Sequence, residues 1–316
     1  MMVQICGLLH KKIIQIYNMF TPIAFFGKKG GLILDNYTTA IAYSLRKLRS
    51  NYIGNCLRIR RSSDNTTKDI GFKNNYLDWE DALDFVGTGA GFVEIWYDQS
   101  GNANNISQSI LAEQPRLIQS GAAVDLTRFI SRNGQIGMLC DDGSQRHLRA
   151  DSGDILKVLR AKSHLQTYTV TSNDSNVGSV IMHISVPGSS TTAASRHLVD
   201  YNTGLRTGGR RLDSDGFSGT SPGTYTSDLI LATSILNHSA DRNSIYQNGT
   251  LVNTRSPYRG TGITSDTDSA VVVIGALSNK TLPLTGIISE CIIFNTDLES
   301  ERSKIENNII NYYSLV

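Results

Sequence analysis

The chain has 316 residues, of which 40% are hydrophobic and 18% are charged, and its formal net charge is +2. A chain of this length can bury a large core without disulfides or a structural metal. The near balance of charges argues against nucleic acid as a partner, because proteins that bind phosphate backbones concentrate Lys and Arg into a strong positive field. The nearest basic cluster, Arg58-Ile59-Arg60-Arg61, is more typical of a solvated or internally paired face.

The N-terminal stretch is apolar but does not have the pattern of a membrane anchor. Polar and charged residues interrupt it between Met1 and Phe26, and no apolar run approaches the ~20 residues needed to span a bilayer. It has no early positive charges and no clean small-residue cleavage site, so it differs from a signal peptide. We expect residues 1–31 to form an N-terminal arm, with Met19 as an alternative start. Residues 32–316 are expected to form one domain.

Helical patterns occur near both ends of the chain. Apolar residues recur on one face between Asn36 and Arg49, which predicts a short amphipathic helix. Asp78 can cap a second helix, Trp79–Val86, that stops at Gly87. Near the other end, Thr296-Asp297-Leu298-Glu299 fits a capping box at the start of a C-terminal helix. The apolar face of that helix consists of Leu298, Ile305, Ile309 and Tyr312.

Most of the remaining chain has the pattern of β-structure. Asn248-Gly249 is the strongest hairpin signal, because both turn residues tolerate positive φ. Short strands separated by turn residues predict a sandwich or a barrel. The expected strands are Cys56–Arg61, Phe92–Tyr97, Ile136–Cys140, Gln166–Thr171, Ser179–Val186, Arg196–Tyr201, Leu229–Leu236, Ser244–Gln247, Thr250–Asn253, Ala270–Gly275 and Ile287–Phe294.

The most distinctive stretch runs from Phe92 to Asn105. The apolar strand Phe92–Tyr97 breaks abruptly into the polar turn Asp98-Gln99-Ser100-Gly101. Such a turn either places side chains at the rim of a sheet or anchors a buried loop. Adjacent residues on a strand point to opposite faces, so at most one of Trp96 and Tyr97 can face a ligand. Of these two alternatives, we favour the anchor.

Signals for metals and cofactors are weak. The four cysteines are far apart, and the six histidines include no His-x-x-x-His pair. We therefore expect no catalytic metal and no cofactor. Calcium is the open alternative, because Asp98 and Asn104 carry the oxygens that it prefers, although no Asp-x-Asp-x-Asp-Gly spacing is present.

Four stretches of the chain form a familiar pattern: Ala42-Tyr43-Ser44-Leu45-Arg46, Arg58-Ile59-Arg60-Arg61-Ser62-Ser63-Asp64, Asp69-Ile70-Gly71-Phe72 and Trp96-Tyr97-Asp98-Gln99-Ser100-Gly101-Asn102. Together they resemble the catalytic domain of the arabinofuranosidase B family, a concanavalin A-like sandwich, or jelly roll, of two antiparallel sheets. The C-terminal portion resembles the closing strands of laminin-G-like domains. The resemblance implies a mainly β, concanavalin A-like sandwich with short N-terminal helices and a C-terminal helix.

The resemblance also allows the catalytic positions to be compared. The family's nucleophile is a glutamate at a strand end, where Asp200-Tyr201-Asn202-Thr203-Gly204-Leu205 places Tyr201 or Asn202. The family's acid is an aspartate just after an Ile-Gly-Gly run, where Ile274-Gly275-Ala276-Leu277-Ser278 places Leu277. A retaining glycosidase needs both carboxylates, so their loss would remove the chemistry. Asp200 is left as the one displaced carboxylate that could serve instead.

Two of these patterns, around Arg60 and around Trp96, also resemble jelly-roll domains of virion and tail-associated proteins. That resemblance implies a non-catalytic virion surface or tail protein, on a virion or outside cells, whose sandwich recognises a glycan or packs against other virion proteins. The alternatives are a glycoside hydrolase of arabinofuranosidase type and a purely structural capsid or scaffold subunit. A homo-oligomer is a further expectation of the scaffold alternative.

A glycan would be recognised by polar side chains and by an aromatic face. The arginines and aspartates have a structural alternative, which is to tie the N-terminal layer to the sandwich. The candidate carbohydrate-binding residues are Arg60, Arg61, Asp64, Asp69, Trp96, Asp98, Gln99, Asn104, Asp200 and Tyr201.

Overall fold

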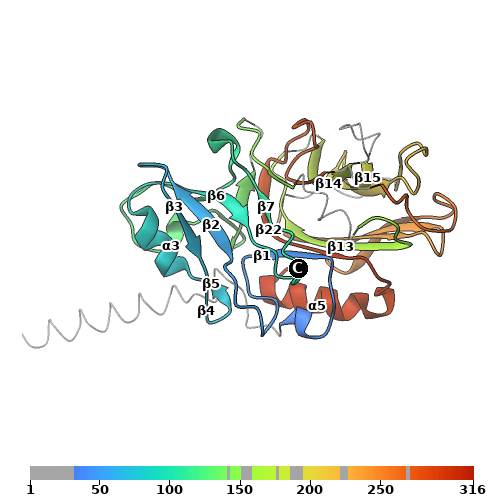
Figure 1. Ribbon diagram of the computed structural model, residues 1–316, viewed down its shortest axis with the longest axis horizontal. Helices are drawn as coiled ribbons and strands as arrows, with labels where there is room; N and C mark the ends of the chain where they lie inside the picture. The colour runs from blue at the N-terminus through green and yellow to red at the C-terminus, as the bar shows by residue number, and fades with distance from the viewer. Residues whose placement is uncertain are drawn as a thin grey trace, which may run out of the picture.

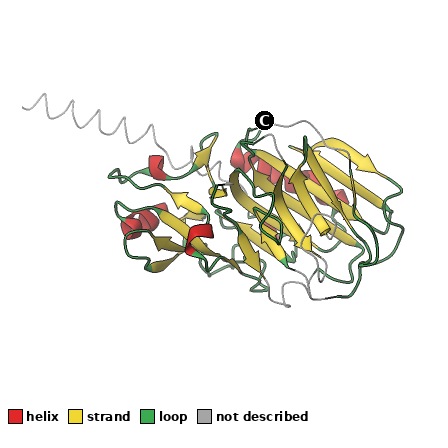
Figure 2. Ribbon diagram, turned by 90° about the horizontal axis from the view of Figure 1, so that it is seen from above, coloured by secondary structure: helices red, strands yellow, loops and turns green. Residues whose placement is uncertain are grey.

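The computed structural model describes residues 32–140, 143–150, 159–175, 178–185, 195–220, 227–267 and 271–316. The predicted N-terminal arm, residues 1–31, lies outside the described residues, as do the predicted strand ends Val186 and Ala270. The strands form two facing layers with a smaller lobe at one end (Figure 1). Seen from above, the lobe with helix α3 (Trp79–Val86) lies on one side and the sandwich on the other (Figure 2).

The first layer is antiparallel and centres on β22 (Gly286–Phe294), which pairs with β13 on one side and with both β1 and β11 on the other. Beyond β13 the order continues through β18 and β19 to β20. The bounds are β1 (Ile41–Ser44), β11 (Met138–Cys140), β13 (His164–Thr171), β18 (Ile230–Asn237), β19 (Arg242–Gln247) and β20 (Thr250–Arg255).

The second layer is also antiparallel. Its strands follow the order β17, β16, β15, β14, β21 and β12. The bounds are β12 (Leu148–Ala150), β14 (Ser179–Ser185), β15 (Ser195–Tyr201), β16 (Leu205–Gly209), β17 (Ser218–Gly219) and β21 (Val272–Ile274).

The alternation of side chains along β22 explains how the layers pack. Cys291 and Ile293 face the interior and share one apolar cluster with residues of the second layer such as Ile184. Ile292 and Phe294 point the other way, into a second cluster closed by the C-terminal helix α5 (Arg302–Tyr313). Figure 1 shows α5 along the outer face of the layer that contains β13, β22 and β1. A strand that is buried on both faces therefore lies at the centre of the fold.

The smaller lobe is joined to both layers. Its strand β6 (Gly91–Trp96) pairs with β2 on one side and with β7 and β8 on the other. In turn, β7 pairs with β12 of the second layer and β8 pairs with β11 of the first. The other elements here are β2 (Leu57–Arg61), β3 (Thr67–Ile70), β4 (Phe72–Lys73), β5 (Tyr76–Leu77), β7 (Ile106–Ser107), β8 (Arg116–Ile118), β9 (Ser131–Arg132), β10 (Gln135–Ile136) and the 3₁₀ helices η1 (Ile33–Asp35), η2 (Leu111–Glu113) and η3 (Leu126–Arg128).

The predicted mainly β fold is confirmed, together with several local features. The Asp78 side chain accepts a hydrogen bond from the Asp81 amide at the start of α3, and Gly87 ends that helix with a φ of 55°. Asn248 and Gly249 link β19 to β20 with φ values of 49° and 81°. Within the described residues, no helix is both long enough and apolar enough to cross a membrane.

The predicted helix between Asn36 and Arg49 is wrong. The segment forms strand β1, in which Ile41 and Tyr43 face the cluster between the layers and Ala42 faces the α5 side. Every residue of β1 is buried, so the apolar residues that suggested a helical stripe belong to two faces of a strand. Pairing with β22 therefore overrides the local pattern.

Two smaller predictions also need correction. The predicted strand Ile136–Cys140 is split into β10 and β11 around Gly137, where a Cβ atom would lie 2.7 Å from Ile287 Cδ1. The capping box at Thr296 is absent, because the Glu299 amide donates to Asp297 instead and a 3₁₀ turn, η5 (Glu299–Glu301), precedes α5. The C-terminal helix itself is confirmed, with Ile305 and Ile309 buried as predicted.

Candidate functional site

The turn after β6 is an anchor for β1. Asp98 Oδ1 accepts hydrogen bonds from the amides of Ala42 (2.8 Å) and Ser100 (2.9 Å). Its Oδ2 accepts from Ser100 Oγ (2.5 Å) and from the Asn104 amide (3.0 Å). Four protein donors therefore surround the carboxylate, which is 3% exposed. A calcium ion at this carboxylate would have to displace some of these donors.

Gln99 extends the same anchor toward the residues that follow β1. Its Oε1 accepts from the Leu48 amide at 2.8 Å, and its Nε2 donates to the carbonyls of Ser44 and Arg46 at 3.1 and 2.9 Å. The side chain is completely buried. Asp98 and Gln99 thus both satisfy backbone groups in the interior, which is a positioning role.

The aromatic candidates are buried as well. Trp96 is fully buried and packs against the Tyr43 ring at 5.6 Å between centroids. Asn104 is 6% exposed, and its carbonyl accepts a hydrogen bond from the Tyr43 hydroxyl. Tyr201 is 1% exposed and belongs to the cluster between the layers. In this conformation neither the Trp96 ring nor the Tyr201 ring offers a face to a sugar.

Three candidates of the small lobe form ion pairs close to the surface. Arg61 pairs with Asp64 (2.6 Å) and Arg58 pairs with Asp69 (2.8 Å). The Tyr97 hydroxyl also donates to Asp69 at 2.6 Å. The hydrogen bond from Arg58 lowers the pKa of Asp69, and burial acts against it. These contacts join β2, β3 and the end of β6 to one another. Arg61, Asp64 and Asp69 therefore have a structural role here, which was the alternative to glycan binding.

Asp200 lies on the outer face of the second layer. Its carboxylate is 2% exposed and is bound by Arg206 through two hydrogen bonds of 2.9 and 2.5 Å. Burial raises the pKa of Asp200, and Arg206 acts in the opposite direction. Leu198, two residues earlier on the same strand face, packs with Leu277 in a small apolar cluster. The position where the resemblance places the family's acid is therefore filled by an apolar contact.

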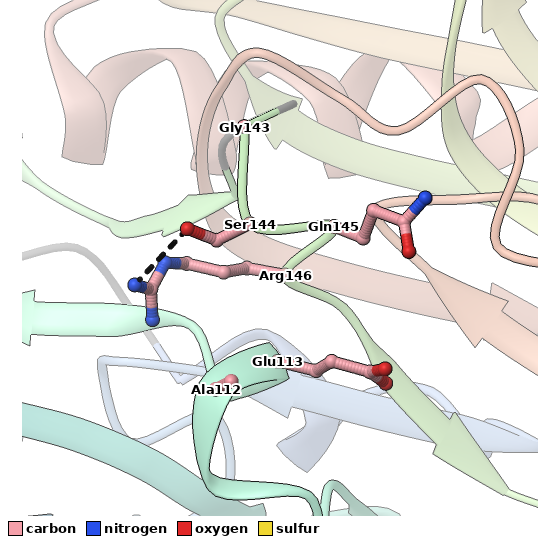
Figure 3. A pocket seen from close by; sticks show the side chains of 6 residues that line it. All are labelled: Ala112, Glu113, Gly143, Ser144, Gln145 and Arg146. Carbon is pink, nitrogen blue, oxygen red and sulfur yellow. Dashed lines mark hydrogen bonds between the residues drawn. The ribbon is translucent and has the colours of Figure 1, made fainter.

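An open pocket lies where the small lobe meets the second layer. Its volume is about 480 Å³, and it lies between η2 and the turn that leads into β12 (Figure 3). A backbone hydrogen bond of 3.1 Å from the His147 amide to the Glu113 carbonyl holds the two walls together. The lining residues are Ala112, Glu113, Gly143, Ser144, Gln145 and Arg146.

One wall of the pocket carries a carboxylate within a polar network. Glu113 Oε1 is 2.7 Å from Lys280 Nζ, and Glu113 Oε2 accepts a hydrogen bond of 3.3 Å from Nε2 of the Gln108 side chain. The same Gln108 nitrogen lies 3.1 Å from Nε2 of His147. Burial lowers the pKa of His147, so the ring is neutral at pH 7. Its Nδ1–H then donates to the Gln145 carbonyl at 2.7 Å, which leaves Nε2 as the acceptor for Gln108.

The opposite wall carries a guanidinium group. Arg146 donates to the Gln114 carbonyl at 2.7 Å and lies within 3.4 Å of Ser144 Oγ, the contact drawn in Figure 3. Its Cζ is 5.1 Å from the centre of the Phe92 ring, and Arg60 lies 4.7 Å from the same ring. Burial, followed by the positive charge of Arg146, lowers the pKa of Arg60.

Among the predicted residues, Arg60 has contacts with residues that flank the pocket lining. It donates to Gln114 Oε1 at 2.6 Å and to the Leu111 carbonyl at 3.2 Å. Sequence reasoning missed Glu113, Arg146 and Lys280, because they come from segments that are distant in the chain and match no motif. The pocket thus presents a carboxylate and a guanidinium with fixed partners, beside the half-exposed side chains of Ile110 and Leu111.

Comparison with known proteins identifies the fold. No protein-family model matches the sequence, and no curated protein sequence matches it. An arabinofuranosidase in complex with arabinofuranosyl-alpha-1,2-xylobiose superposes with a TM-score of 0.63 at 17% identity, covering 87% of this chain and 63% of that chain. A GH54 α-L-arabinofuranosidase soaked with a cyclic sulfate inhibitor gives a TM-score of 0.61 with the same identity and coverage. This chain therefore spans less than two thirds of the length of those chains and has the arabinofuranosidase-like β-sandwich fold.

Proposed function

We propose that this protein is a non-catalytic, glycan-binding β-sandwich that holds its ligand in the pocket between η2 and the turn before β12. The observation that carries the proposal is that Glu113 and Arg146 both line one open pocket of this fold, where they offer a carboxylate and a guanidinium at separate places (Figure 3). Sugar hydroxyls are both donors and acceptors, so they suit a site with a carboxylate acceptor and a guanidinium donor. Ile110 and Leu111 precede Ala112 in the chain, and their partly exposed side chains would offer an apolar surface to the C–H faces of a sugar.

The proposal that hydrolysis is absent rests on the candidate catalytic positions. Leu277 packs against Val180 and Leu198, and a carboxylate in that cluster would be buried without a partner. Asn202, at the strand end where the family has its nucleophile, is exposed and carries an amide. Asp200 faces Arg206. A glycosidase of the retaining type needs two carboxyl groups about 5–5.5 Å apart across the sugar bond.

The setting of this activity belongs to the same proposal. A virion surface or tail, or another extracellular location, is supported by the sequence patterns around Arg60 and Trp96. In that setting the sandwich would attach to a glycan receptor, with other virion proteins as additional partners.

A glycan array with the labelled chain tests the binding, and a reducing-sugar assay on arabinose-containing substrates tests the chemistry. The proposal expects saturable binding to a defined group of glycans and no release of sugar. Binding that is unchanged in Arg146→Ala would remove the pocket from the proposal. A stable oligomer without glycan binding would favour the scaffold alternative.

A glycoside hydrolase is the second candidate function, and one observation favours it. Burial raises the pKa of Asp200, as is common for a carboxyl group that acts as a general acid. Release of sugar by the wild-type chain that is abolished in Asp200→Asn would establish this alternative and overturn the non-catalytic proposal.

A further inference from the structure

We propose that His164, Asp297 and Glu299 form a binding site for a divalent transition-metal ion such as Zn²⁺ at the edge of the first layer. His164 is the first residue of β13, and both acids belong to the segment between β22 and α5. The ligand atoms of the three side chains lie within 4.8 Å of one another. His164 Nε2 is 3.8 Å from Asp297 Oδ1 and 3.8 Å from Glu299 Oε1.

The buried imidazole supports a ligand at this position. The His164 side chain is 3% exposed, and neither ring nitrogen has a hydrogen-bond partner among the described residues. A buried polar group without a partner is rare, and each case calls for an unseen ligand, a water or an ion. Gln166 lies two residues along β13 on the same strand face as His164. It is placed to orient the imidazole, as outer groups do for metal-bound histidines.

The two acids are arranged to receive a cation. Asn237, which is opposite His164 in the β13–β18 ladder, donates to Glu299 Oε1 at 2.6 Å, and Arg242 binds Glu299 Oε2. Asp297 Oδ1 accepts from the Glu299 amide at 3.0 Å. One guanidinium faces two carboxylates, so the site has an excess of negative charge before a cation binds.

The geometry is close to that of a zinc site. Zinc–ligand distances of about 2.0–2.2 Å place neighbouring ligand atoms roughly 3.3 Å apart in a tetrahedron. The two separations of 3.8 Å between His164 and the acids would have to shorten by about half an ångström, and the separation between the carboxylate oxygens, which is within 4.8 Å, by up to about 1.5 Å. The Asp297 side chain is 63% exposed and can rotate to make this adjustment, and it also leaves the site open to solvent. Imidazole nitrogen together with carboxylate oxygen favours zinc over calcium, which takes oxygen ligands.

Isothermal titration calorimetry of Zn²⁺ into the metal-free chain tests the site. We expect saturable binding of about one ion per chain, and an increase in melting temperature that a chelator reverses. Asp297→Asn and Glu299→Gln should each weaken binding by at least about tenfold. Because Asp297 is mostly exposed, its substitution leaves the fold intact, which circular dichroism verifies. His164→Gln should also weaken Zn²⁺ binding, and circular dichroism verifies first that this variant is folded.

Asp64→Asn is the matched control, because Asp64 is 43% exposed and pairs with Arg61 in the small lobe, about 100 residues from His164 in the chain. Its affinity for Zn²⁺ should stay within about twofold of the wild type. The proposal is overturned if the chain shows no saturable Zn²⁺ binding, or if Asp297→Asn and Glu299→Gln bind as tightly as the control. It is also overturned if Ca²⁺ binds as tightly as Zn²⁺, because the imidazole would then not be a ligand.

Discussion

Lys280 Nζ lies 2.7 Å from Glu113 Oε1, and this ion pair joins η2 in the small lobe to the loop that follows β21. Glu113 is the more protected partner, since its side chain is 15% exposed and that of Lys280 is 37% exposed. The pair therefore fixes the orientation of the pocket carboxylate from a second part of the fold.

Replacing the lysine should separate binding from stability. Lys280→Met is expected to lower the free energy of unfolding by less than about 1 kcal/mol, because the lysine is solvent-exposed and such pairs contribute little. Glycan affinity should fall several-fold, since Glu113 loses the partner that orients it. Urea denaturation and calorimetric titration measure the two effects, and a large stability loss with unchanged affinity would contradict this account.

The buried pair of Arg46 and Glu290 should behave in the opposite way. Arg46 donates to both Glu290 oxygens, at 2.8 and 3.0 Å, and both side chains are at most 3% exposed. Burial acts to lower the pKa of Arg46, but the adjacent Glu290 charge raises it above its usual value overall. Glu290→Gln leaves a buried guanidinium without its counter-charge, which should cost about 3–5 kcal/mol of stability.

The matched control for that variant is Asp64→Asn, which removes the partner of Arg61 at an exposed pair. Asp64→Asn should cost much less stability than Glu290→Gln, because an exposed ion pair contributes little. Equal losses for the two variants, measured by urea denaturation, would show that burial does not determine the strength of these pairs.

The anchor role of Asp98 gives a third prediction. Asp98→Asn replaces one acceptor oxygen by a donor and leaves the buried Asn104 amide or the Ser100 amide facing it. The loss should be at least about 2 kcal/mol, because an unsatisfied buried donor costs 1–3 kcal/mol and a repulsive contact is added. Asp125→Asn is the control, since Asp125 accepts from the Thr127 amide in an exposed turn and asparagine caps equally well. A loss no greater than that of the control would remove the anchor role.

Stability should fall in mild acid because of buried histidines. Burial lowers the pKa of His197 to about 3 and those of His183 and His238 to about 4. The unfolded chain binds these protons near pH 6.5 and the folded chain does not, so each histidine removes about 1.4 kcal/mol per pH unit below 6.5, until its folded pKa is reached. Burial raises the pKa values of Asp200 and Glu306, and these acids act in the opposite sense.

The pH prediction is measured by urea denaturation at several values between pH 7.5 and 4.5. We expect a constant free energy of unfolding above about pH 6.5 and a progressive decrease below it. In His183→Gln, the slope of this decrease should be smaller by about 1.4 kcal/mol per pH unit, which corresponds to one proton. A free energy of unfolding that rises as the pH falls from 6.5 to 5 would contradict the assignment of neutral buried histidines.

Some parts of the fold were predictable because local chemistry determines them. The Asn248–Gly249 hairpin follows from positive φ, and the α3 helix follows from its Asp78 cap. The resemblance around Trp96 also pointed to the correct sandwich. The segment around Ile41 was predicted wrongly, since its pairing with β22 involves residues far away in the sequence.

The sites were harder to predict than the fold. Arg60 belongs to the predicted set and contacts residues that flank the pocket lining, but Glu113 and Arg146 line one pocket only through the pairing of β7 and β8 with the two layers. The cluster of His164 and Asp297 joins positions about 130 residues apart, so no spacing rule reveals it. Long-range strand pairing creates both sites, and sequence periodicity does not determine that pairing.

The central claim is that the pocket between η2 and the turn before β12 binds a glycan. Calorimetric titration of the array-selected glycan into wild type, Glu113→Gln, Arg146→Ala and the control Arg61→Ala tests it most directly. The account predicts at least tenfold weaker binding for both pocket variants, about 1.4 kcal/mol each, and unchanged binding for the control. Pocket variants that bind as tightly as wild type, or a control that alone loses affinity, would contradict it.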